Sequence, residues 1–401
     1  MRILMVSNLY PPFYQGGYEI ACKQLTDALR MRGHQVRVLT STYGVERPMA
    51  QGDILRHLRI LIDPHRMRRE ILFKELANRY RFAHACRYYK PDIVFIWNLT
   101  HVSASLSHAA MNRNIPVCYY VFDRWFENWD ADHWNSMRRS VSAIDRILVA
   151  LGILLGLPTT DAIPCIGNAI FASQYLKNMA LEHGLPVERN PVLRWGVDTE
   201  RFAIKIEKET SPIRLLYVGQ IAKHKGVHTV LQAMGILLSE KGKKDRYLLT
   251  ITGDERQFPD YTAELKDIVR DLGIGEAVTF TGKVEHKSLP ALYSDHDILV
   301  FPSIWDEPYG MVLVEAMASG LAIVSTATGG SAELIRDNET GLVFNRDDPS
   351  SCASQIRRLS DHRQLLMKLR IAARSAAEEM LRFDRTVDSV EAYLQAAVER
   401  R

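Results

Sequence analysis

Short apolar runs alternate regularly with helical segments through the first half of this chain, and the same alternation starts again in the second half. This pattern limits the possible folds more than any other feature of the sequence. Short apolar runs bounded by turn residues are typical of strands buried on both faces. Alternation of such runs with helices predicts parallel sheets covered by helices, so we expect an α/β protein with two doubly wound domains. The predicted strands are residues 2–7, 35–40, 92–98, 115–123 and a short strand within 163–175 in the first half, and 213–219, 247–253, 277–282, 297–303 and 321–326 in the second.

A stretch without periodicity separates the two halves. Residues 191–202 contain Pro, Gly and Asp, and the charged run IKIEKETSP follows them, which is typical of a domain boundary. With 401 residues, the chain is long enough for two domains of about 180–200 residues each. We therefore predict an N-terminal domain over residues 1–200 and a C-terminal domain over 201–380. A final helix over 381–401 is expected to pack back toward the N-terminal domain.

Composition argues against several classes of protein. The net charge of +4 is too small to indicate nucleic-acid binding, and no nucleic-acid-binding motif supports it. The five cysteines are scattered without a CxxC pair, which is typical of reduced thiols in a cytoplasmic protein. The longest apolar segment, residues 147–158, is much shorter than the ~20 residues of a membrane-spanning helix. Residues 1–12 are predicted to begin an interior strand and not a signal peptide.

A helical stretch at residues 65–90 carries eight Lys or Arg residues against Glu70 and Glu75. A basic helix could attract anionic lipid head groups, and the protein would then lie at the inner face of a membrane as a peripheral protein. The alternative is a solvated helix face, which we favour because runs of like charge are common on protein surfaces.

The loop after the first predicted strand carries Gly16 and Gly17 immediately before a helix. Open α/β sheets bind ligands at this end of their strands. The spacing is not GxGxxG, so the loop argues against a dinucleotide-dependent dehydrogenase.

An aromatic cluster follows the predicted strand at 115–123. Its flat rings could form the wall of a sugar-binding pocket or a small aromatic core under a loop, and the sequence leaves both open. Two Asp-x-Asp pairs could suggest a metal–diphosphate clamp, but they are more simply turn residues. The aromatic cluster comprises Trp125, Phe126, Trp129 and Trp134, and the aspartate pairs are Asp130/Asp132 and Asp295/Asp297.

The segment 302–333 carries the residues with the clearest chemistry. Glu307 and Glu315 lie eight residues apart across a predicted loop-to-helix junction, and the pair Gly329-Gly330 precedes a second helix. Glycine turns that lead into helix N-termini offer backbone N–H groups to an anion. This segment therefore predicts a site for a phosphorylated, hydroxyl-rich ligand.

The loop at residues 218–227 supplies positive charge. Lys223, Lys225 and His224 lie between a predicted strand and a helix N-terminus, where anions are favoured. We expect these cations to bind phosphate and the two carboxylates to bind hydroxyl groups. Paired carboxylates could also hold a metal, but no histidine or third carboxylate lies at ligand spacing, so we predict no metal.

Together these motifs resemble the retaining GT-B glycosyltransferases of family 4, over nearly the whole chain. The resemblance implies the GT-B fold, in which two Rossmann-like domains face each other across a cleft. The motifs that carry it are Gly16-Gly17-x-Glu19, Gly196-Val197-Asp198, VGQIAKHKG at 218–226, Glu307-x7-Glu315 and Gly329-Gly330-x-x-Glu333.

The resemblance implies transfer of a hexose from a nucleotide diphosphate sugar to a sugar-containing or lipid-linked acceptor, with retention of configuration and without metal or other cofactor. Glu315 would bind the ribose, Glu307 the transferred sugar, and Lys225 the diphosphate. The implied donor-binding residues are Gly16, Gly17, Gly219, Gln220, Lys223, Lys225, Glu307, Tyr309, Gly310, Met311, Val312 and Glu315, and the implied acceptor-binding residues are Glu19, Trp97, Asn98, Arg124 and Trp125.

Two positions depart from the family pattern. Gln220 stands where the family usually has an arginine, and a neutral amide has neither the charge nor the forked geometry of a guanidinium. Lys223 could compensate. Phe122 and then Asp123 stand where many members have a histidine, although Asp123 could instead cap the following helix. The candidates to replace the histidine are Asp123, His101 and His133, in that order.

The sequence thus predicts a metal-independent hexosyltransferase with Asp123, Glu307 and Lys225 as catalytic residues. Two alternatives are a catalytically degenerate subunit that binds a nucleotide sugar and a nucleotide-sugar epimerase of the same architecture. A glycoside hydrolase is less consistent with the residues, because Glu307 and Glu315 are better explained as donor ligands than as a catalytic pair.

Overall fold

The chain folds into two compact units. The computed structural model describes residues 1–61, 68–160, 166–202, 212–240 and 246–400, without the side chains of residues 68 and 128–131. One unit comprises Met1–Leu193 with Val387–Arg401, and the other comprises Arg194–Thr386. The sequence had suggested boundaries at residues 200 and 380.

The first unit is built on a seven-stranded sheet with the strand order β3-β4-β2-β1-β5-β6-β7. All neighbouring strands are parallel except β3 and β4, which pair antiparallel at one edge. The central strands are buried along nearly their whole length, as expected for a sheet covered on both faces. The strands are β1 (Arg2–Ser7), β2 (Gln35–Ser41), β3 (Met49–Gln51), β4 (Ile54–Leu58), β5 (Ile93–Asn98), β6 (Val117–Val121) and β7 (Ala169–Phe171).

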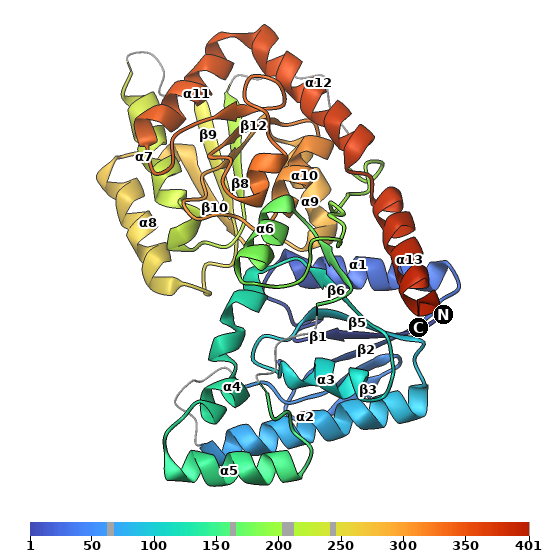
Figure 1. Cartoon of the computed structure of the whole chain (residues 1–401). Coiled ribbons are helices and arrows are strands. Elements are labelled where there is room, and N and C mark those ends of the chain that lie inside the picture. Colours follow the sequence, from blue (N-terminus) through green and yellow to red (C-terminus); the bar gives the residue numbers. More distant parts are fainter. Residues whose placement is uncertain (62–67, 161–165, 203–211, 241–245, 401) are drawn as a thin grey trace. The chain divides into compact units, whose positions relative to one another are not determined.

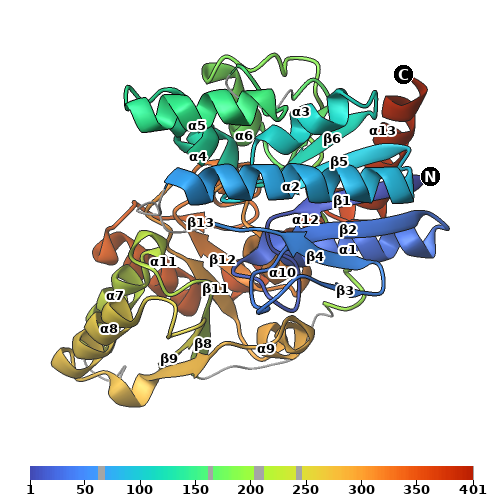
Figure 2. The same ribbon diagram turned by 90° about the horizontal axis from the view of Figure 1, so that it is seen from below.

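Helices connect these strands and cover the sheet (Figures 1 and 2). The last helix of the chain starts in the second unit and ends in the first. Within the first unit, its Glu391 binds Arg32, with 2.7 Å between Oε2 and Nη1. The helices are α1 (Gly17–Met31), α2 (Arg68–Tyr89), α3 (Ser105–Met111), the 3₁₀ helix η1 (Arg124–Ala131), α4 (His133–Arg138), α5 (Ala143–Leu154), α6 (Gln174–Glu182) and α13 (Phe383–Glu399).

The second unit has a six-stranded sheet with the order β10-β9-β8-β11-β12-β13, and all its strand pairs are parallel. The order reverses at β8, because β9 lies on one side of it and β11 on the other. Open sheets bind ligands at the carboxyl ends of the strands on either side of such a switch point. The strands are β8 (Ile213–Val218), β9 (Tyr247–Thr252), β10 (Val278–Gly282), β11 (Ile298–Phe301), β12 (Ala322–Ser325) and β13 (Leu342–Val343).

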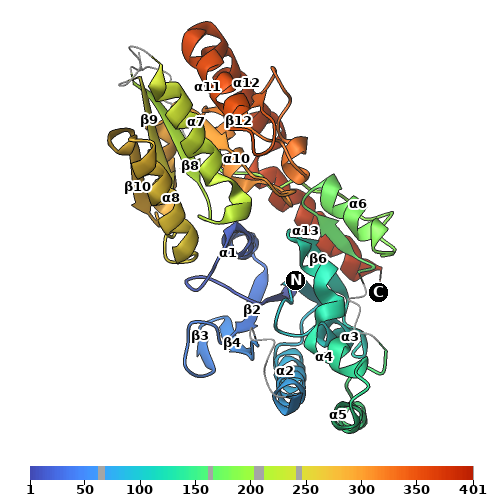
Figure 3. The same ribbon diagram turned by 90° about the vertical axis from the view of Figure 1, so that its left-hand side faces the viewer.

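Alternate residues of these strands face opposite sides of the sheet. Leu215 of β8 and Val300 of β11 belong to a core formed with α7, α8, α11 and α12, whereas Leu216 and Leu299 face the other side and are equally buried. Figures 1 and 3 show the helices arranged around the strands. They are η2 (Lys223–Lys225), α7 (Val227–Ser239), α8 (Pro259–Asp271), η3 (Gly275–Ala277), η4 (His286–Ser288), α9 (Leu289–Ser294), α10 (Met311–Ala318), η5 (Gly330–Glu333), α11 (Pro349–Asp361) and α12 (Arg363–Met380).

The predicted fold class is confirmed, since both halves are α/β units with predominantly parallel sheets. The prediction did not include the short edge strands β3, β4 and β13. None of the described helices combines the length and the apolar character needed to cross a lipid bilayer.

Candidate functional site

The candidate donor site is built on the loops that follow β8 and β11 in the second unit. Gly226 brings these two loops together: its φ of 70° is left-handed, and a Cβ at this position would lie 2.1 Å from the carbonyl oxygen of Pro302. Only glycine combines this conformation with so close an approach. Beside it, the N–H of Ile304 donates to the carbonyl oxygen of His224 over 3.0 Å. The loop that contains Lys225 is therefore held directly against the loop that leads to Glu307.

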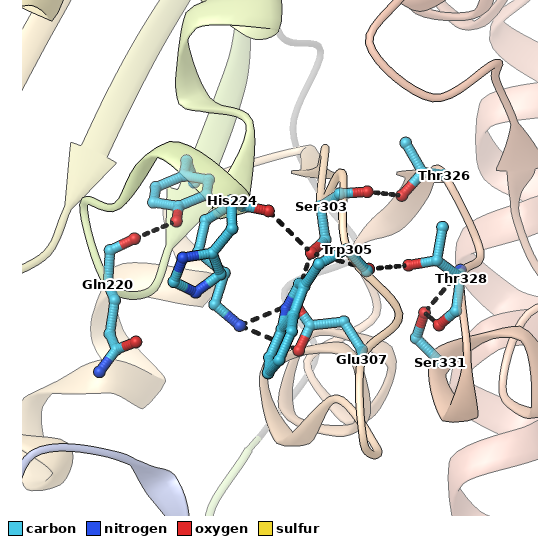
Figure 4. A network of polar contacts seen from close by, with 10 residues as sticks. Gln220, His224, Ser303, Trp305, Glu307, Thr326, Thr328 and Ser331 are labelled. Carbon is cyan, nitrogen blue, oxygen red and sulfur yellow. Dashed lines mark hydrogen bonds and ion pairs between the residues drawn. The ribbon is translucent and has the colours of Figure 1, made fainter. Parts of the chain in front are cut away.

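Lys225 and Glu307 form the central ion pair of the site. Nζ of Lys225 lies 2.8 Å from Oε1 and 3.0 Å from Oε2 of Glu307, and the hydroxyl of Ser303 donates to the same Oε1 over 2.6 Å (Figure 4). Nζ also lies 4.9 Å from the centre of the Trp305 ring. The lysine is partly exposed and the glutamate is buried. This arrangement fixes a cation beside the carboxyl ends of the two strands.

The segment after β12 holds the Glu307 loop in place. The hydroxyl of Thr326 donates to the carbonyl oxygen of Ser303, and that of Thr328 donates to the carbonyl oxygen of Trp305, both over 2.7 Å (Figure 4). These bonds connect two loops at the same edge of the sheet, so the backbone that carries Glu307 is tied to the rigid strands.

The Gly329-Gly330 pair is part of this support. Gly329 has φ 55°, and a Cβ there would lie 2.6 Å from the carbonyl oxygen of Glu307. The N–H of Gly330 donates to that carbonyl oxygen over 2.6 Å. The expectation that this glycine turn offers its N–H groups to an anion is therefore wrong for Gly330, whose N–H is already used to hold Glu307.

The N-terminus of α10 supplies further donors. Gly310, with φ 114°, precedes the helix, and its carbonyl oxygen accepts the N–H of Leu313 over 3.0 Å. The N–H groups of Met311 and Val312 are in the first turn, where an α-helix provides no internal acceptor. Tyr309 lies in the core beside this turn, and its hydroxyl donates to the carbonyl oxygen of Trp195.

Glu315 lies further along α10 and is buried. The hydroxyl of Tyr293 donates to its Oε2 over 2.9 Å, and Nε2 of His286 lies 3.0 Å from its Oε1. Burial and the nearby Glu315 charge raise the pKa of Tyr293 well above its usual value, so this hydroxyl keeps its proton. Since each carboxylate oxygen can accept more than one hydrogen bond, Glu315 is oriented by these two partners and retains capacity for a ligand hydroxyl.

The other candidate donor-binding residues of this loop are His224, Lys223 and Gln220, and none of them is part of the Lys225–Glu307 ion pair. Burial and the neighbouring Lys225 lower the pKa of His224, which disfavours its charged form and makes it the weakest of the three candidate cations. Lys223 is exposed. The carbonyl oxygen of Gln220, which follows Gly219, accepts the hydroxyl of Tyr217, while its side-chain amide points away from Glu307 in Figure 4.

The predicted residues of the first unit lie at the carboxyl ends of β1, β5 and β6. Gly16 precedes α1, whose first residue is Gly17. Glu19 is buried, and its carboxylate accepts the N–H groups of Gly16 (3.0 Å) and Gln15 (3.2 Å). Burial raises the pKa of Glu19 to about 7, and the charge of Asp123 contributes to the rise. The geometry therefore gives Glu19 a role in shaping the glycine loop.

Asp123 lies two residues after the end of β6. Its Oδ1 accepts the N–H of Arg124, the first residue of η1, over 2.7 Å. Arg124 forms a two-pronged ion pair with Glu127, at 2.7 and 3.0 Å. Asn98 ends β5, and its side chain accepts the N–H of Thr100.

The aromatic residues near these strand ends form a core. Trp97 is buried, and its ring centroid lies 6.0 Å from that of Phe122 in a stacked arrangement. Trp125, Phe126 and Trp134 are also buried, which agrees with the alternative of an aromatic core. The side chain of Trp129 lies outside the described residues.

The described residues contain no group of three His, Cys, Asp or Glu side chains that could hold a metal ion. Asp297 immediately precedes β11 and accepts the N–H of Arg214, and Asp132 caps α4 by accepting the N–H of Trp134. Both have the structural roles expected of turn residues. The side chain of Asp130 is outside the described part of the chain.

Sequence reasoning missed the partners of the two carboxylates. Ser303 and Trp305 were visible next to Glu307 in the chain, but their contacts depend on how the loop folds. Tyr293 and His286 reach Glu315 from a segment more than 20 residues earlier in the chain, and no local pattern connects them.

Comparisons with known proteins agree with this architecture. The family model described as "Glycosyltransferase Family 4" matches residues 15–201, and the model described as "Glycosyl transferases group 1" matches residues 198–376. An uncharacterized glycosyltransferase of Methanocaldococcus jannaschii is 26% identical over 370 residues, which cover 90% of each chain.

Two solved structures are similar in fold. The sucrose-phosphate synthase of Thermosynechococcus elongatus has a TM-score of 0.75 at 18% identity, with 100% of both chains covered. The Anabaena protein HepE, solved in complex with UDP and glucose, has a TM-score of 0.71 at 16% identity, with 99% of this chain and 100% of that chain covered. The chain therefore belongs to the GT-B glycosyltransferases, its first half corresponding to the family 4 model and its second half to the group 1 model.

Proposed function

We propose that this glycosyltransferase transfers a hexose from a nucleotide diphosphate sugar to an acceptor hydroxyl, with retention of the anomeric configuration. The observation that carries the proposal is the Lys225–Glu307 pair, in which a lysine is held 2.8 Å from a buried carboxylate at the switch point of a parallel sheet. The cation of Lys225 can bind a negatively charged diphosphate, and the carboxylate of Glu307 can accept hydrogen bonds from sugar hydroxyls. The first turn of α10 lies a few residues after Glu307 and adds backbone donors for an anion.

In this proposal each residue acts on a defined part of the donor. Lys225 and the N–H groups of Met311 and Val312 bind the diphosphate, Glu307 accepts hydrogen bonds from the transferred sugar, and Glu315 accepts them from the ribose. Tyr293 and His286 position Glu315, since both are within hydrogen-bond distance of its carboxylate.

The reaction breaks the bond between the anomeric carbon and the diphosphate oxygen and forms a bond from the same carbon to the acceptor oxygen. The acceptor hydroxyl gives up its proton as the nucleotide diphosphate leaves. Negative charge grows on the leaving diphosphate in an oxocarbenium-like transition state. A cation fixed in advance stabilises that charge without reorganisation, so Lys225 is the residue we expect to contribute most to the rate. In this scheme Lys225 and the helix N–H groups stabilise the negative charge of the diphosphate, a role that a divalent ion would otherwise fill.

The first unit is proposed to bind the acceptor, with Asp123 as the group that interacts with the reacting hydroxyl. Its place shortly after the end of β6 supports this role, as does its charge, which contributes to the raised pKa of Glu19. Sugar-containing and lipid-linked molecules are both suitable acceptors. The names of the similar structures, a sucrose-phosphate synthase and a protein bound to UDP and glucose, make UDP-glucose the first donor to test.

Nuclear magnetic resonance of the reaction products tests this proposal without knowledge of the acceptor. Many transferases slowly transfer sugar to water, so UDP-glucose incubated with the protein should first release α-glucose, the anomer retained from the donor. The Lys225→Met variant should release it about 10²–10³-fold more slowly. Initial release of β-glucose would contradict retention, and release of a different free hexose would indicate the epimerase instead.

A catalytically degenerate subunit is the second candidate. Phe122, at the position where many family members have a histidine, is packed against Trp97 in the core and has no titratable group. In that case UDP-glucose would bind, with neither transfer nor hydrolysis.

A further inference from the structure

Helix α5 of the first unit exposes a continuous apolar stripe. Its members recur at intervals of three and four residues, which puts them on one side of an α-helix. Their exposed fractions are 66% for Ile144, 69% for Ile147, 44% for Leu151 and 82% for Leu154. We call these four residues the α5 stripe. Large aliphatic side chains exposed together on one helix face indicate an interaction surface.

The opposite side of α5 is firmly packed, so rotation of the helix cannot bury the stripe. Leu148, Val149 and Ile153 contact a small core that contains Leu72 and Trp134. At Gly152 the packing is so close that a Cβ would lie 2.5 Å from the Trp134 ring. Figures 1 and 2 show α5 at the margin of the unit, next to α2.

The exposed charged residues in α5 and in the segment just before it are arginines. Arg146 lies within α5 and Arg139 shortly before it, and both side chains are exposed. Asp145, the one acidic residue of the helix, is on the packed side and is buried. A partner of the exposed face therefore meets aliphatic side chains and arginines but no carboxylate from α5.

This combination matches the surface of an anionic bilayer better than a protein partner. Helices that lie in the membrane interface carry Leu, Phe or Trp on one face and Lys or Arg on the other. Helix α5 exposes Leu and Ile together with Arg146, and it has none of the aromatic residues in which protein interfaces are enriched. The helix has 12 residues, which corresponds to about 18 Å. That length suits a helix lying in the plane of the interface and is too short to span the bilayer.

The basic stretch at 65–90 is a weaker candidate for the same role. Within α2, Lys74 and Glu75 are buried and pair with each other at 2.9 Å, and the hydroxyls of Ser103 and Ser105 donate to Glu75. Lys74 is therefore part of the interior and not of a basic outer face.

We propose that the α5 stripe docks onto membranes that contain anionic phospholipid, with Ile147 and Leu151 inserted among the acyl chains and Arg139 and Arg146 beside the head groups. This inference does not depend on the proposed donor or acceptor.

Flotation of the full chain with vesicles tests it directly. The protein should float with phosphatidylcholine vesicles that contain about 30% phosphatidylglycerol and much less with phosphatidylcholine alone. Each arginine near the surface is expected to add about fivefold in affinity. The double variant Arg139→Glu/Arg146→Glu should therefore bind more than tenfold more weakly, and high salt should weaken the wild type in the same way.

Removal of the apolar contact gives the decisive variant. Ile147→Glu/Leu151→Glu should lose binding by at least tenfold, while Ile371→Glu should bind as the wild type does. Ile371 is a matched control, because it is 57% exposed on α12 in the second unit. Circular dichroism should give the same melting curve for all three.

Three results would overturn the proposal. They are failure of the wild type to float with the anionic vesicles, flotation of Ile147→Glu/Leu151→Glu equal to that of the wild type, and a wild-type dimer in light scattering that the same double variant converts to a monomer. The last result would assign the stripe to contact between two copies of the chain.

Discussion

The carboxyl ends of the two sheets carry similar residue types but use them differently. In the second unit, Glu307 is paired with Lys225, and the pair is oriented by Ser303. In the first unit, Glu19 is buried against backbone N–H groups of its own loop, and the charged neighbour that affects it most is another acid, Asp123. A carboxylate near a glycine loop can therefore bind a ligand or hold the loop itself, and the presence of a neighbouring cation separates the two cases.

The largest effect is expected from Lys225→Met, which keeps the length of the side chain and removes its charge. Loss of one preorganised group that stabilises transition-state charge costs about 10²–10³-fold in rate, so kcat/KM for the donor should fall by that factor. Steady-state kinetics with the donor identified by ligand binding would measure it. The matched control is Lys223→Met, since Lys223 is an exposed lysine of the same loop. Equal losses in the two variants would argue against a special role for the ion pair.

The next prediction concerns Glu19, whose pKa is raised from its ordinary value of 4.5 to about 7 by burial. The folded chain then binds this proton more tightly than the unfolded chain, so the contribution to stability is complete below about pH 4.5 and is lost as the pH rises to about 7. The full loss corresponds to about 3 kcal/mol. Urea unfolding of the wild type and of Glu19→Gln, compared across this range, should give a shallower pH dependence for the variant.

Glu46→Gln provides the control for that measurement, because Glu46 is an exposed glutamate of the same unit. It should keep the wild-type slope. If the free energy of unfolding of Glu19→Gln depended on pH as steeply as that of the wild type, Glu19 would not have the raised pKa.

Gly329→Ala should weaken the support of Glu307. The new Cβ would lie 2.6 Å from the carbonyl oxygen of Glu307 in a residue whose φ is 55°. Gly273→Ala is a matched control, because Gly273 has φ 65° and no atom within 4 Å of a Cβ. Both variants pay about 1 kcal/mol for the left-handed backbone, and Gly329→Ala should lose about 1–3 kcal/mol more through displacement of the loop. Thermal denaturation would compare them, and equal melting temperatures would contradict this role of Gly329.

The smallest effect is expected from Asp123→Asn. If Asp123 accepts a hydrogen bond from the reacting hydroxyl, turnover should fall by about tenfold or more while donor affinity stays the same. The substitution should also lower the pKa of Glu19, because the Asp123 charge contributes to its rise. Full turnover in the variant would remove Asp123 from the catalytic residues and leave it as the partner of the Arg124 N–H.

The alternating pattern was sufficient to predict both sheets, because their central strands are buried apolar runs. The edge strands were not predictable in the same way. β4 contains Arg56, which is buried because its guanidinium donates to the carbonyl oxygens of Tyr10 and Pro11. A buried arginine in a five-residue strand looks like a surface residue when only the sequence is read.

The same limit applies to the candidate site. Lys225, Glu307 and Glu315 could be named because they lie in motifs with recognisable spacing. The roles of Gly330 and His224 could not be inferred, because one depends on a hydrogen bond across two loops and the other on burial beside Lys225. Motif spacing predicts which residues come together in the site. Tertiary packing decides which of their polar groups already make hydrogen bonds within the protein and which of them carry a charge.

The central claim is that the carboxyl ends of the strands in the second unit bind a nucleotide diphosphate sugar through Lys225. A thermal-shift panel of UDP-, GDP-, ADP- and TDP-sugars, applied to the wild type and to Lys225→Met, tests it most directly. A ligand at 100 times its dissociation constant adds about 2.7 kcal/mol to the stability of the folded state. We expect one nucleotide sugar to raise the melting temperature of the wild type and Lys225→Met to lose most of this rise. A wild type that no nucleotide sugar stabilises, or a variant stabilised as much as the wild type, would contradict it.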